Sequence, residues 1–398
     1  MRFLIIIFLF LSLQFKAQVN FVGNPSFESY FNCTATNYVS VAKYWNSLDS
    51  IKLGASGEYL NTCYPYVPYN AGGFQYPRTG NAYIRATSYC NLPTCAFPYL
   101  RNYPKNRLLS NLVSGKTYCA KMHVNLTNTS PYSIGALGIY LSDASVDTIK
   151  YCMIPLTYLV PQVQNPISNF IGDTLNWIEI SGTFTATGIE KYLVIGNFQT
   201  DIATTKTITR VGGGNFSEYY FDDVSVIDFN LPAYAGPDKN INLGDSAFIG
   251  RPPEIGLECT WSSGTTTVGT GGGIWVKPPI GTYSYIVTQN ICGNIKTDTV
   301  NVNVSPSSIS ETTLFSNSIG IYPQPAKDLL NININYFYES SVEVKVFDVN
   351  GRVVIREQLI VNRGKAELST AEFSNGVYIL QIVNSKGVVA NKRLIIAR

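Results

Sequence analysis

Short runs in which apolar and polar residues alternate recur along this chain of 398 residues, and they constrain its fold more than any other feature. A period of two is typical of strands that have one buried and one exposed face. The clearest runs of the first part are TYCAKMHVNLT (117–127), WIEISGTFTAT (177–187) and YYFDDVSVID (219–228). No convincing amphipathic helix separates them. The pattern predicts an all-β protein.

Composition and charge narrow the class further. The chain is 45% hydrophobic and only 14% charged, with 27 Tyr and 32 Gly, which is typical of extracellular β-proteins rather than helical cytosolic enzymes. Its net charge is +3, and residues 317–398 carry the whole excess with ten basic and seven acidic residues. The rest is neutral, so the sequence predicts no nucleic-acid partner and no attraction to an anionic membrane.

The first eighteen residues, MRFLIIIFLFLSLQFKAQ, have the pattern of a secretory signal peptide. Arg2 precedes an apolar run at 3–13, and the small residue Ala17 suits a cleavage site. The apolar run is too short to span a bilayer comfortably, and no later stretch is long and apolar enough to cross one. We therefore expect an exported protein without a transmembrane anchor.

Turns and linkers divide the remainder into three tandem β-sandwich domains. The first covers residues 19–229 and the second 232–304, which ends with the strand pair GTYSYIVTQN and IKTDTVNVNV. A polar linker at 305–316 precedes the third, 317–398, whose strands meet at Asn-Gly and Lys-Gly turns.

The third domain carries the most specific motifs. IGIYPQPAKDLLNI is followed by VKVFDVNGRVV, then by LSTAEFSNGVYILQI and finally by the basic NKRLIIAR. This order resembles the type A C-terminal sorting domain of the type IX (Por) secretion system of Bacteroidota. The resemblance implies export through the outer membrane to the cell surface or the medium. It also implies two partners, the type IX secretion machinery and its sortase.

The second domain resembles the PKD-like or immunoglobulin-like modules of secreted Bacteroidota proteins, and we expect it to act as a spacer. Eight cysteines in an exported chain indicate disulfides. Two of them, Cys259 and Cys292, lie in this domain, where we expect them to pair beneath Trp261. For the first domain we expect two further pairs and leave Cys119 and Cys152 unassigned. Those pairs are Cys33 with Cys63 and Cys90 with Cys95.

The first domain opens with VNFVGNPSFESYFNC and closes with EYYFDDVSVIDFN, and this pairing resembles the galactose-binding-like jelly rolls of many carbohydrate-binding modules. By alternation Asp222 lies in line with core residues and Asp223 points outward. A buried carboxylate needs a partner, so we expect a structural Ca²⁺ bound by Asp222, Glu28 and the backbone around Asn24. The alternative is that Glu28 and Asp222 are solvated or paired in salt bridges.

A Pro- and Gly-rich loop of the first domain is crowded with aromatic residues and two arginines. Aromatic rings stack on the C–H faces of sugars while arginines bind hydroxyls, so this loop is a candidate glycan site. The alternative is a buried hydrophobic cluster beneath a disulfide-tied loop. The candidate ligand-binding residues are Tyr64, Tyr66, Tyr69, Phe74, Tyr76, Arg78 and Arg85.

Catalytic motifs are missing from the sequence. It has no GxSxG, no HExxH and a single histidine, His123, in an alternating strand. We therefore expect a non-catalytic, exported protein whose jelly roll binds a glycan or polysaccharide. Two alternatives stay open: an adhesive or structural surface protein with protein partners, and a polysaccharide hydrolase whose two carboxylates converge only in space.

Overall fold

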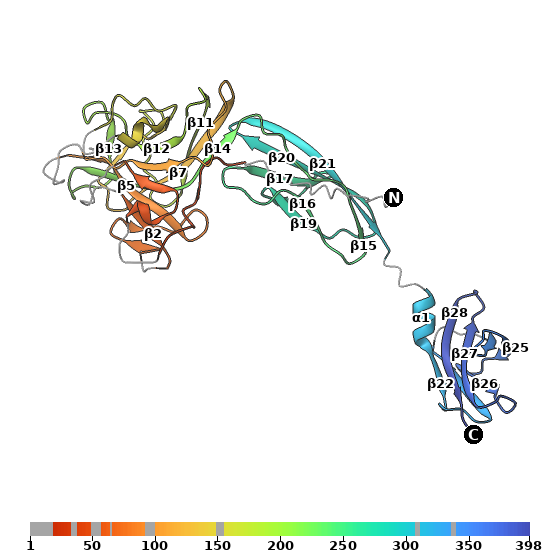
Figure 1. The fold of residues 1–398 in the computed structure, drawn as a ribbon. Helices are drawn as coiled ribbons and strands as arrows, with labels where there is room; N and C mark the ends of the chain where they lie inside the picture. Colours follow the sequence, from red (N-terminus) through yellow and green to blue (C-terminus); the bar gives the residue numbers. More distant parts are fainter. Residues whose placement is uncertain are drawn as a thin grey trace, which may run out of the picture. The chain divides into compact units, whose positions relative to one another are not determined.

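The computed structural model describes residues 19–32, 38–48, 57–63, 66–91, 100–148, 155–306, 311–335 and 340–398. Almost all its regular structure is strand, and α1 (Glu311–Ser318) is the one α-helix of these residues (Figure 1). The predicted all-β class is therefore confirmed. The chain divides into two compact units: one holds the first two sandwiches up to Val304, and the other holds the third.

Two five-stranded antiparallel sheets form the first sandwich. One has the order β11-β7-β14-β5-β2 and the other the order β1-β6-β12-β9-β10. The strands of the first sheet are β2 (Glu58–Asn61), β5 (Ala82–Cys90), β7 (Thr117–Leu126), β11 (Ile178–Thr185) and β14 (Phe216–Asp228). Those of the second are β1 (Trp45–Ser47), β6 (Pro104–Arg107), β9 (Gly138–Ser142), β10 (Val163–Gln164) and β12 (Tyr192–Gly196).

Smaller elements decorate this sandwich. They are the hairpin of β3 (Tyr69–Asn70) and β4 (Gly73–Phe74), the pair of β8 (Tyr132–Ile134) and β13 (Lys206–Ile208), and the 3-10 turns η1 (Val39–Val41) and η2 (Ala144–Thr148).

Apolar side chains from both sheets meet in one core. Met122, Phe221 and Ile84 from one sheet and Ile139 and Leu193 from the other are all fully buried. Burial of this kind contributes about 1.5–3 kcal/mol for each large side chain, so the two sheet faces stabilise each other.

The opposite face of strand β7 is also buried, although it is polar. Lys121, His123 and Asn125 are only 3%, 5% and 0% exposed. Alternation alone predicts that such residues face water. They are covered because the loop before β5 and the second sandwich both pack on this face.

The second sandwich consists of the sheet β15-β21-β20-β17-β18 and the pair β16-β19. Its core holds the fully buried Trp261, whose Nε1 donates to the carbonyl oxygen of Gly271 at 3.0 Å. Its strands are β15 (Lys239–Asn242), β16 (Ala247–Gly250), β17 (Glu258–Ser263), β18 (Thr266–Thr270), β19 (Gly273–Val276), β20 (Gly281–Ile291) and β21 (Asn294–Ser305).

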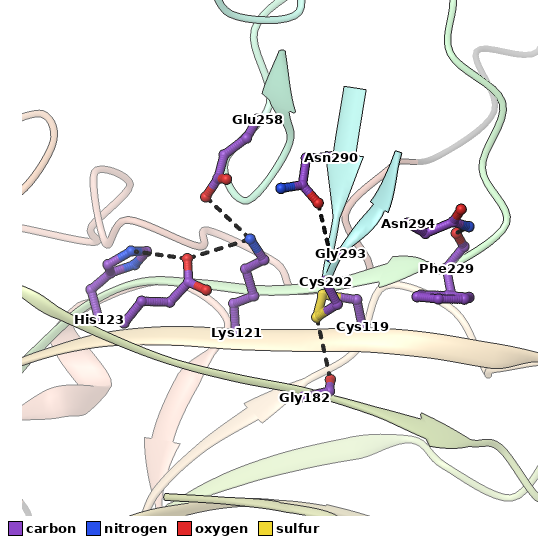
Figure 2. The surroundings of a disulfide bond; sticks show 11 residues. Cys119, Lys121, His123, Gly182, Phe229, Glu258, Asn290, Cys292, Gly293 and Asn294 are labelled. Carbon is purple, nitrogen blue, oxygen red and sulfur yellow. Dashed lines mark hydrogen bonds and ion pairs between the residues drawn. A yellow bond between two sulfur atoms is a disulfide. The ribbon is translucent and has the colours of Figure 1, made fainter. Parts of the chain in front are cut away.

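A disulfide joins the first two sandwiches. Cys119 of β7 is bonded to Cys292, in the turn between β20 and β21, with their Cα atoms 5.8 Å apart (Figure 2). Beside it, the Nζ atom of Lys121 lies 3.1 Å from a carboxylate oxygen of Glu258. Ile227 of β14 also belongs to the hydrophobic core of the second sandwich. The two sandwiches therefore share covalent, ionic and apolar contacts.

The expected Cys259–Cys292 disulfide is wrong, and strand register explains why. Cys259 of β17 lies opposite Gln289 of β20, so Cys292 is three residues farther along. Three residues of extended chain span about 10 Å, beyond the roughly 7 Å that a disulfide allows between Cα atoms. Cys259 stays a buried free thiol.

The other expected pairs cannot be followed in full. Cys63 and Cys90 are both disulfide-bonded. Cys33, Cys95 and Cys152 lie outside the described residues, as does the expected signal peptide at 1–18. These two pairings stay predictions.

The third sandwich packs a three-stranded sheet, β22-β23-β26, on a four-stranded one, β25-β24-β27-β28. The core between them includes Leu330, Val344 and Leu380, all fully buried. Its strands are β22 (Ile319–Tyr322), β23 (Leu329–Ile334), β24 (Ser341–Phe347), β25 (Val353–Ile360), β26 (Lys365–Ser369), β27 (Gly376–Val383) and β28 (Val389–Ile396).

The proline segment at 322–326 lies along the outer edge of β28. The side chain of Gln324 accepts from the backbone N–H of Ile395 at 3.0 Å and donates to the carbonyl oxygen of Arg393 at 3.1 Å. The N–H of Ala326 then donates to the carbonyl oxygen of Ile395 at 2.7 Å. An exposed strand edge can pair with other chains. Here the proline segment occupies the edge of β28 and forms hydrogen bonds with its backbone groups instead.

The interdomain disulfide predicts the result of peptide mapping. A digest of the non-reduced protein should contain a peptide pair linking Cys119 to Cys292, and alkylation should label Cys259 only after denaturation. A linked peptide containing Cys259 and Cys292 would contradict the structure.

The same disulfide should contribute strongly to stability because it closes a loop with a sequence separation of 173 residues. We expect Cys119→Ser with Cys292→Ser to lower the free energy of unfolding of the first unit by about 2–5 kcal/mol in chemical denaturation. Cys259→Ala is the matched control, since it removes a sulfur but no cross-link, and should change stability less.

Candidate functional site

Three aromatic rings stand in contact with one another on the hairpin β3–β4 and just after it. We call Tyr69, Phe74 and Tyr76 the aromatic shelf. Phe74 lies in the middle, with its ring centroid 4.9 Å from that of Tyr69 and 5.3 Å from that of Tyr76. The side chains are 71%, 40% and 62% exposed, respectively. Exposed aromatic side chains in contact are unusual and mark a candidate binding surface.

Hydrogen bonds fix the hairpin beneath the shelf. The amide oxygen of Asn128 accepts from the N–H of Phe74 at 2.7 Å, and that of Asn70 accepts from the N–H of Gly72 at 2.8 Å. A side chain at Gly73, where φ is +122°, would place its Cβ 2.3 Å from the Asn128 oxygen. The turn therefore requires glycine at this position.

A buried aromatic layer supports the hairpin from the sheet side. The hydroxyl of Tyr220 donates to Asn70 Oδ1 at 2.7 Å, and the hydroxyl of Tyr83 donates to the carbonyl oxygen of Gln75 at 2.8 Å. Tyr66 packs, half-buried, against the same cluster. The aromatic loop thus divides into an exposed shelf and a buried support.

The predicted aromatic site is only partly assembled. Tyr69, Phe74 and Tyr76 come together at the surface, whereas Tyr66 lies in the support and Tyr64 lies outside the described residues. The sequence analysis missed Trp177, whose Nε1 donates to the carbonyl oxygen of Tyr76 at 3.1 Å. It is 101 residues away in the chain, and no local pattern connects the two.

The two predicted arginine ligands instead form internal ion pairs. Arg85 is 9% exposed, and its guanidinium lies 2.5 Å from the carboxylate of Glu58 and 3.7 Å from that of Glu218. Arg78 Nη1 lies 2.5 Å from a carboxylate oxygen of Asp223. Both side chains hold the loop and the sheet together.

A bulge in β14 moves both neighbouring acids to the same side of the sheet. The register shifts between Asp222 and Ser225, and Asp223 has φ +49°. Asp223 is only 1% exposed, so the expectation that it points outward is wrong. Regular alternation would place Asp223 next after Phe221 on the core side of β14. Because the bulge interrupts the alternation, Val224 takes that place instead.

Backbone N–H groups of the loop before β5 neutralise part of this acidic pair. One carboxylate oxygen of Asp222 accepts from the N–H of Arg78 at 2.8 Å and from that of Thr79 at 3.4 Å. Burial, followed by the charge of Asp223, raises the pKa of Asp222 well above its usual value. The guanidinium of Arg78 pairs with Asp223, whereas Asp222 is bonded by backbone N–H groups alone.

The predicted calcium ligands each have protein donors in this structure. Asn24 Oδ1 accepts from the N–H of Ser29 at 2.9 Å, and the carboxylate of Glu28 accepts from the N–H groups of Asn81 and Ala82 at 2.8 and 3.0 Å. Within the described residues, no group of three or more His, Cys, Asp or Glu is placed to hold a metal ion. The calcium site stays a prediction.

His123 lies in the same covered region. Burial, followed by the nearby charge of Arg78, lowers its pKa to about 4, so the imidazole is neutral at pH 7. Its Nε2 is 3.7 Å from the carboxylate of Glu179, and its Nδ1 has no hydrogen-bond partner among the residues that the structure describes. Because the ring is 5% exposed, it offers no surface to a substrate.

Comparison with known proteins explains the third sandwich. Residues 320–397 match the family model of a secretion system C-terminal sorting domain. The chain therefore carries a sorting domain. Such domains mark proteins for export through the type IX system and for the cell surface, so the predicted localisation and route are confirmed.

Other comparisons add little. The chain is 12% identical to a CBM22 xylan-binding domain of Paenibacillus barcinonensis Xyn10C, over 51% of this chain and 90% of that one, with a TM-score of 0.27. It is 14% identical to the K3 adhesin domain of Lys-gingipain of Porphyromonas gingivalis, over 47% and 93%, also with a TM-score of 0.27. We draw no functional conclusion from either. No curated protein matches the chain.

The regular structure is almost entirely strand, with one α-helix among the described residues. Within the described residues, no helix combines the length and the apolar character needed to span a membrane.

The ion pair with Asp223 predicts that Arg78 stabilises the fold, whereas the exposed rings of the aromatic shelf do not. Arg78→Gln removes the cation beside buried Asp223 and leaves it only the hydroxyl of Thr79, so we expect the free energy of unfolding to fall by roughly 3 kcal/mol. Tyr69→Ala removes an exposed ring and should change it by no more than about 0.5 kcal/mol. Urea denaturation measures both, and an unchanged stability in the Arg78 variant would exclude this structural role.

Proposed function

We propose that the protein is a non-catalytic, cell-surface glycan-binding protein whose aromatic shelf contacts the sugar. The observation that carries this proposal is the mutual contact of three exposed rings on one hydrogen-bonded hairpin. Sugar rings present apolar C–H faces, and aromatic side chains that are held rigidly bind such faces at little entropic cost. The sorting domain supplies the delivery of this surface to the outside of the cell.

The orientation of the rings indicates the kind of glycan. The plane of Phe74 is inclined by 62° to that of Tyr69 and by 85° to that of Tyr76. The three rings therefore do not form one flat platform. A flat crystalline polysaccharide suits a coplanar row of rings, whereas this arrangement suits a single chain that twists between successive sugars.

Charge contributes little to the proposed contact. The neighbouring arginines are occupied by Asp223, Glu58 and Glu218, so the shelf presents rings and backbone rather than free charges. Binding at the shelf should then depend weakly on salt, since screening acts on charges and not on apolar stacking.

A protein partner is the rival occupant, because exposed aromatic residues are also common in protein interfaces. A catalytic role has less support than either. The neutral, buried His123 is remote from solvent, and the shelf itself contains no acid or nucleophile.

The shelf proposal predicts that binding and folding can be separated. In affinity electrophoresis against a panel of soluble polysaccharides, Tyr69→Ala and Tyr76→Ala should each weaken retention by about tenfold, which corresponds to about 1.4 kcal/mol. Their melting temperatures should stay close to that of the parent. Tyr283→Ala, in the second sandwich, is the control and should retain full binding. Retention by no glycan, together with binding to a protein, would favour the rival.

The structural calcium ion is proposed separately. Two adjacent buried carboxylates, of which only Asp223 is paired with a guanidinium, would gain from a cation, which supports the proposal. We expect EDTA to lower the melting temperature of the first unit and added Ca²⁺ to restore it. Asp222→Asn should abolish that difference. A melting curve that EDTA leaves unchanged would reject the ion.

A further inference from the structure

A pocket opens on the other sheet of the jelly roll, β1-β6-β12-β9-β10, at one end of three adjacent strands. Tyr44 directly precedes β1, Arg107 ends β6, and Lys191 directly precedes β12. Trp45 pairs with Asn106, and Tyr192 pairs with Arg107, so these three ends lie side by side. Together with residues 108–111 they line a cavity of about 630 Å³. That volume is within the usual range for small-molecule sites.

The ring of Tyr44 is exposed and yet rigidly placed. Its backbone has φ +69°, a left-handed conformation that is strained for a bulky residue. The ring rests on Gly23, where a Cβ atom would lie 2.7 Å from ring carbons. With 55% of the side chain exposed, the ring offers one face to the pocket.

A buried amide holds this strained geometry. Asn106 is fully buried, and its Nδ2 donates to the carbonyl oxygens of Gly23 at 2.9 Å and of Tyr44 at 3.3 Å. The backbone N–H of Arg107 donates to the same Tyr44 oxygen at 3.3 Å. The surrounding structure thus stabilises an exposed tyrosine in a conformation that it would not adopt by itself.

Two cationic side chains also line the pocket. Arg107 and Lys191 are both exposed, and neither forms an ion pair in the described part of the chain. Among the described residues, no acid lines the pocket. Two acids lie close to Lys191. Asp143 accepts from the N–H of Ser145 at 2.8 Å, and its pKa is lowered first by its bonds to Ser145 and also by the charge of Lys191. Glu190, the preceding residue, accepts from the backbone N–H groups of Thr187 and Gly188.

We propose that this pocket is a second carbohydrate site, which binds an acidic sugar of an anionic polysaccharide. The Tyr44 ring stacks on the sugar face, and the Arg107 guanidinium, whose fork matches a carboxylate, pairs with the acid group beside Lys191. The proposal does not rest on the aromatic shelf, since the two sites share no residue.

Nucleic acid is a weaker candidate for this pocket. Residues 1–316 contain nineteen basic and nineteen acidic residues, so the jelly roll is not part of a broadly basic region. Binding to a phosphate backbone depends on many cations along a surface, whereas this pocket has two.

The test compares two gels with the same sugar backbone, using the full chain. Polygalacturonate carries a carboxylate on each sugar, and fully methyl-esterified polygalacturonate masks it. We expect affinity electrophoresis to show retention in the first gel and at least about tenfold weaker retention in the second. Retention should also fall between 50 and 300 mM NaCl, because ion pairing is screened. Equal retention in both gels would overturn the proposal.

Variants then assign the contact. Arg107→Gln with Lys191→Gln should weaken retention in polygalacturonate about tenfold or more, as should Tyr44→Ala. Tyr44→Phe keeps the ring and should bind like the parent. Lys116→Gln removes an exposed cation that is paired with Asp228 and is the matched charge control. Circular dichroism melting confirms that each variant is folded.

Gly23→Ala tests the placement of the ring without replacing any pocket-lining residue. The added Cβ must displace the Tyr44 ring, so retention should fall although Tyr44, Arg107 and Lys191 all remain. Retention by dextran sulfate that survives Tyr44→Ala and equals retention by polygalacturonate would show unspecific ion attraction and overturn the proposal. The aromatic shelf presents no free charge, so any retention that it provides should be the same in both gels. The difference between the two gels therefore reports the Tyr44 pocket alone, and the two sites can fail independently.

Discussion

Two buried carboxylates in the middle of a sheet determine how the loop before β5 folds over the jelly roll. The bulge in β14 places Asp222 and Asp223 on the same face, where neither reaches water. Buried charge is tolerated only with donors around it. The loop before β5 supplies them through the N–H groups of Arg78 and Thr79 and the guanidinium of Arg78. Because this loop must return to the sheet at 78–79, the preceding residues fold over Tyr83 and Tyr220 and raise the aromatic shelf above them.

The alternation of residues was sufficient to predict the strands and the class of the fold. It was insufficient wherever register or distance decided the outcome. A single extra residue in β14 reverses the side on which Asp223 lies, and no residue type signals that bulge in advance. Similarly, the partner of Cys292 depends on which face of β20 and which neighbouring sandwich it meets, and Cys119 lies 173 residues earlier.

The candidate site shows the same limit. The sequence identified the aromatic loop, and three of its rings are at the surface. It could not distinguish residues that face a ligand from residues that hold the fold together. Arg78 and Arg85 were expected to face a sugar because they lie beside aromatic residues, yet each is closer to an acid from another strand. The Tyr44 pocket was not foreseen, because its residues come from three strands and are unremarkable in the sequence. By contrast, the sorting domain was recognisable because its motifs are local and ordered.

The disulfide between Cys119 and Cys292 has a consequence for the timing of export. It can form only in an oxidising compartment and only after both sandwiches have brought these residues within 5.8 Å between their Cα atoms. Once it is closed, the first 292 residues can no longer be drawn out as one linear thread. If oxidation precedes passage through the outer membrane, the conduit must admit a cross-linked pair of sandwiches, and its bore must exceed the width of a folded domain.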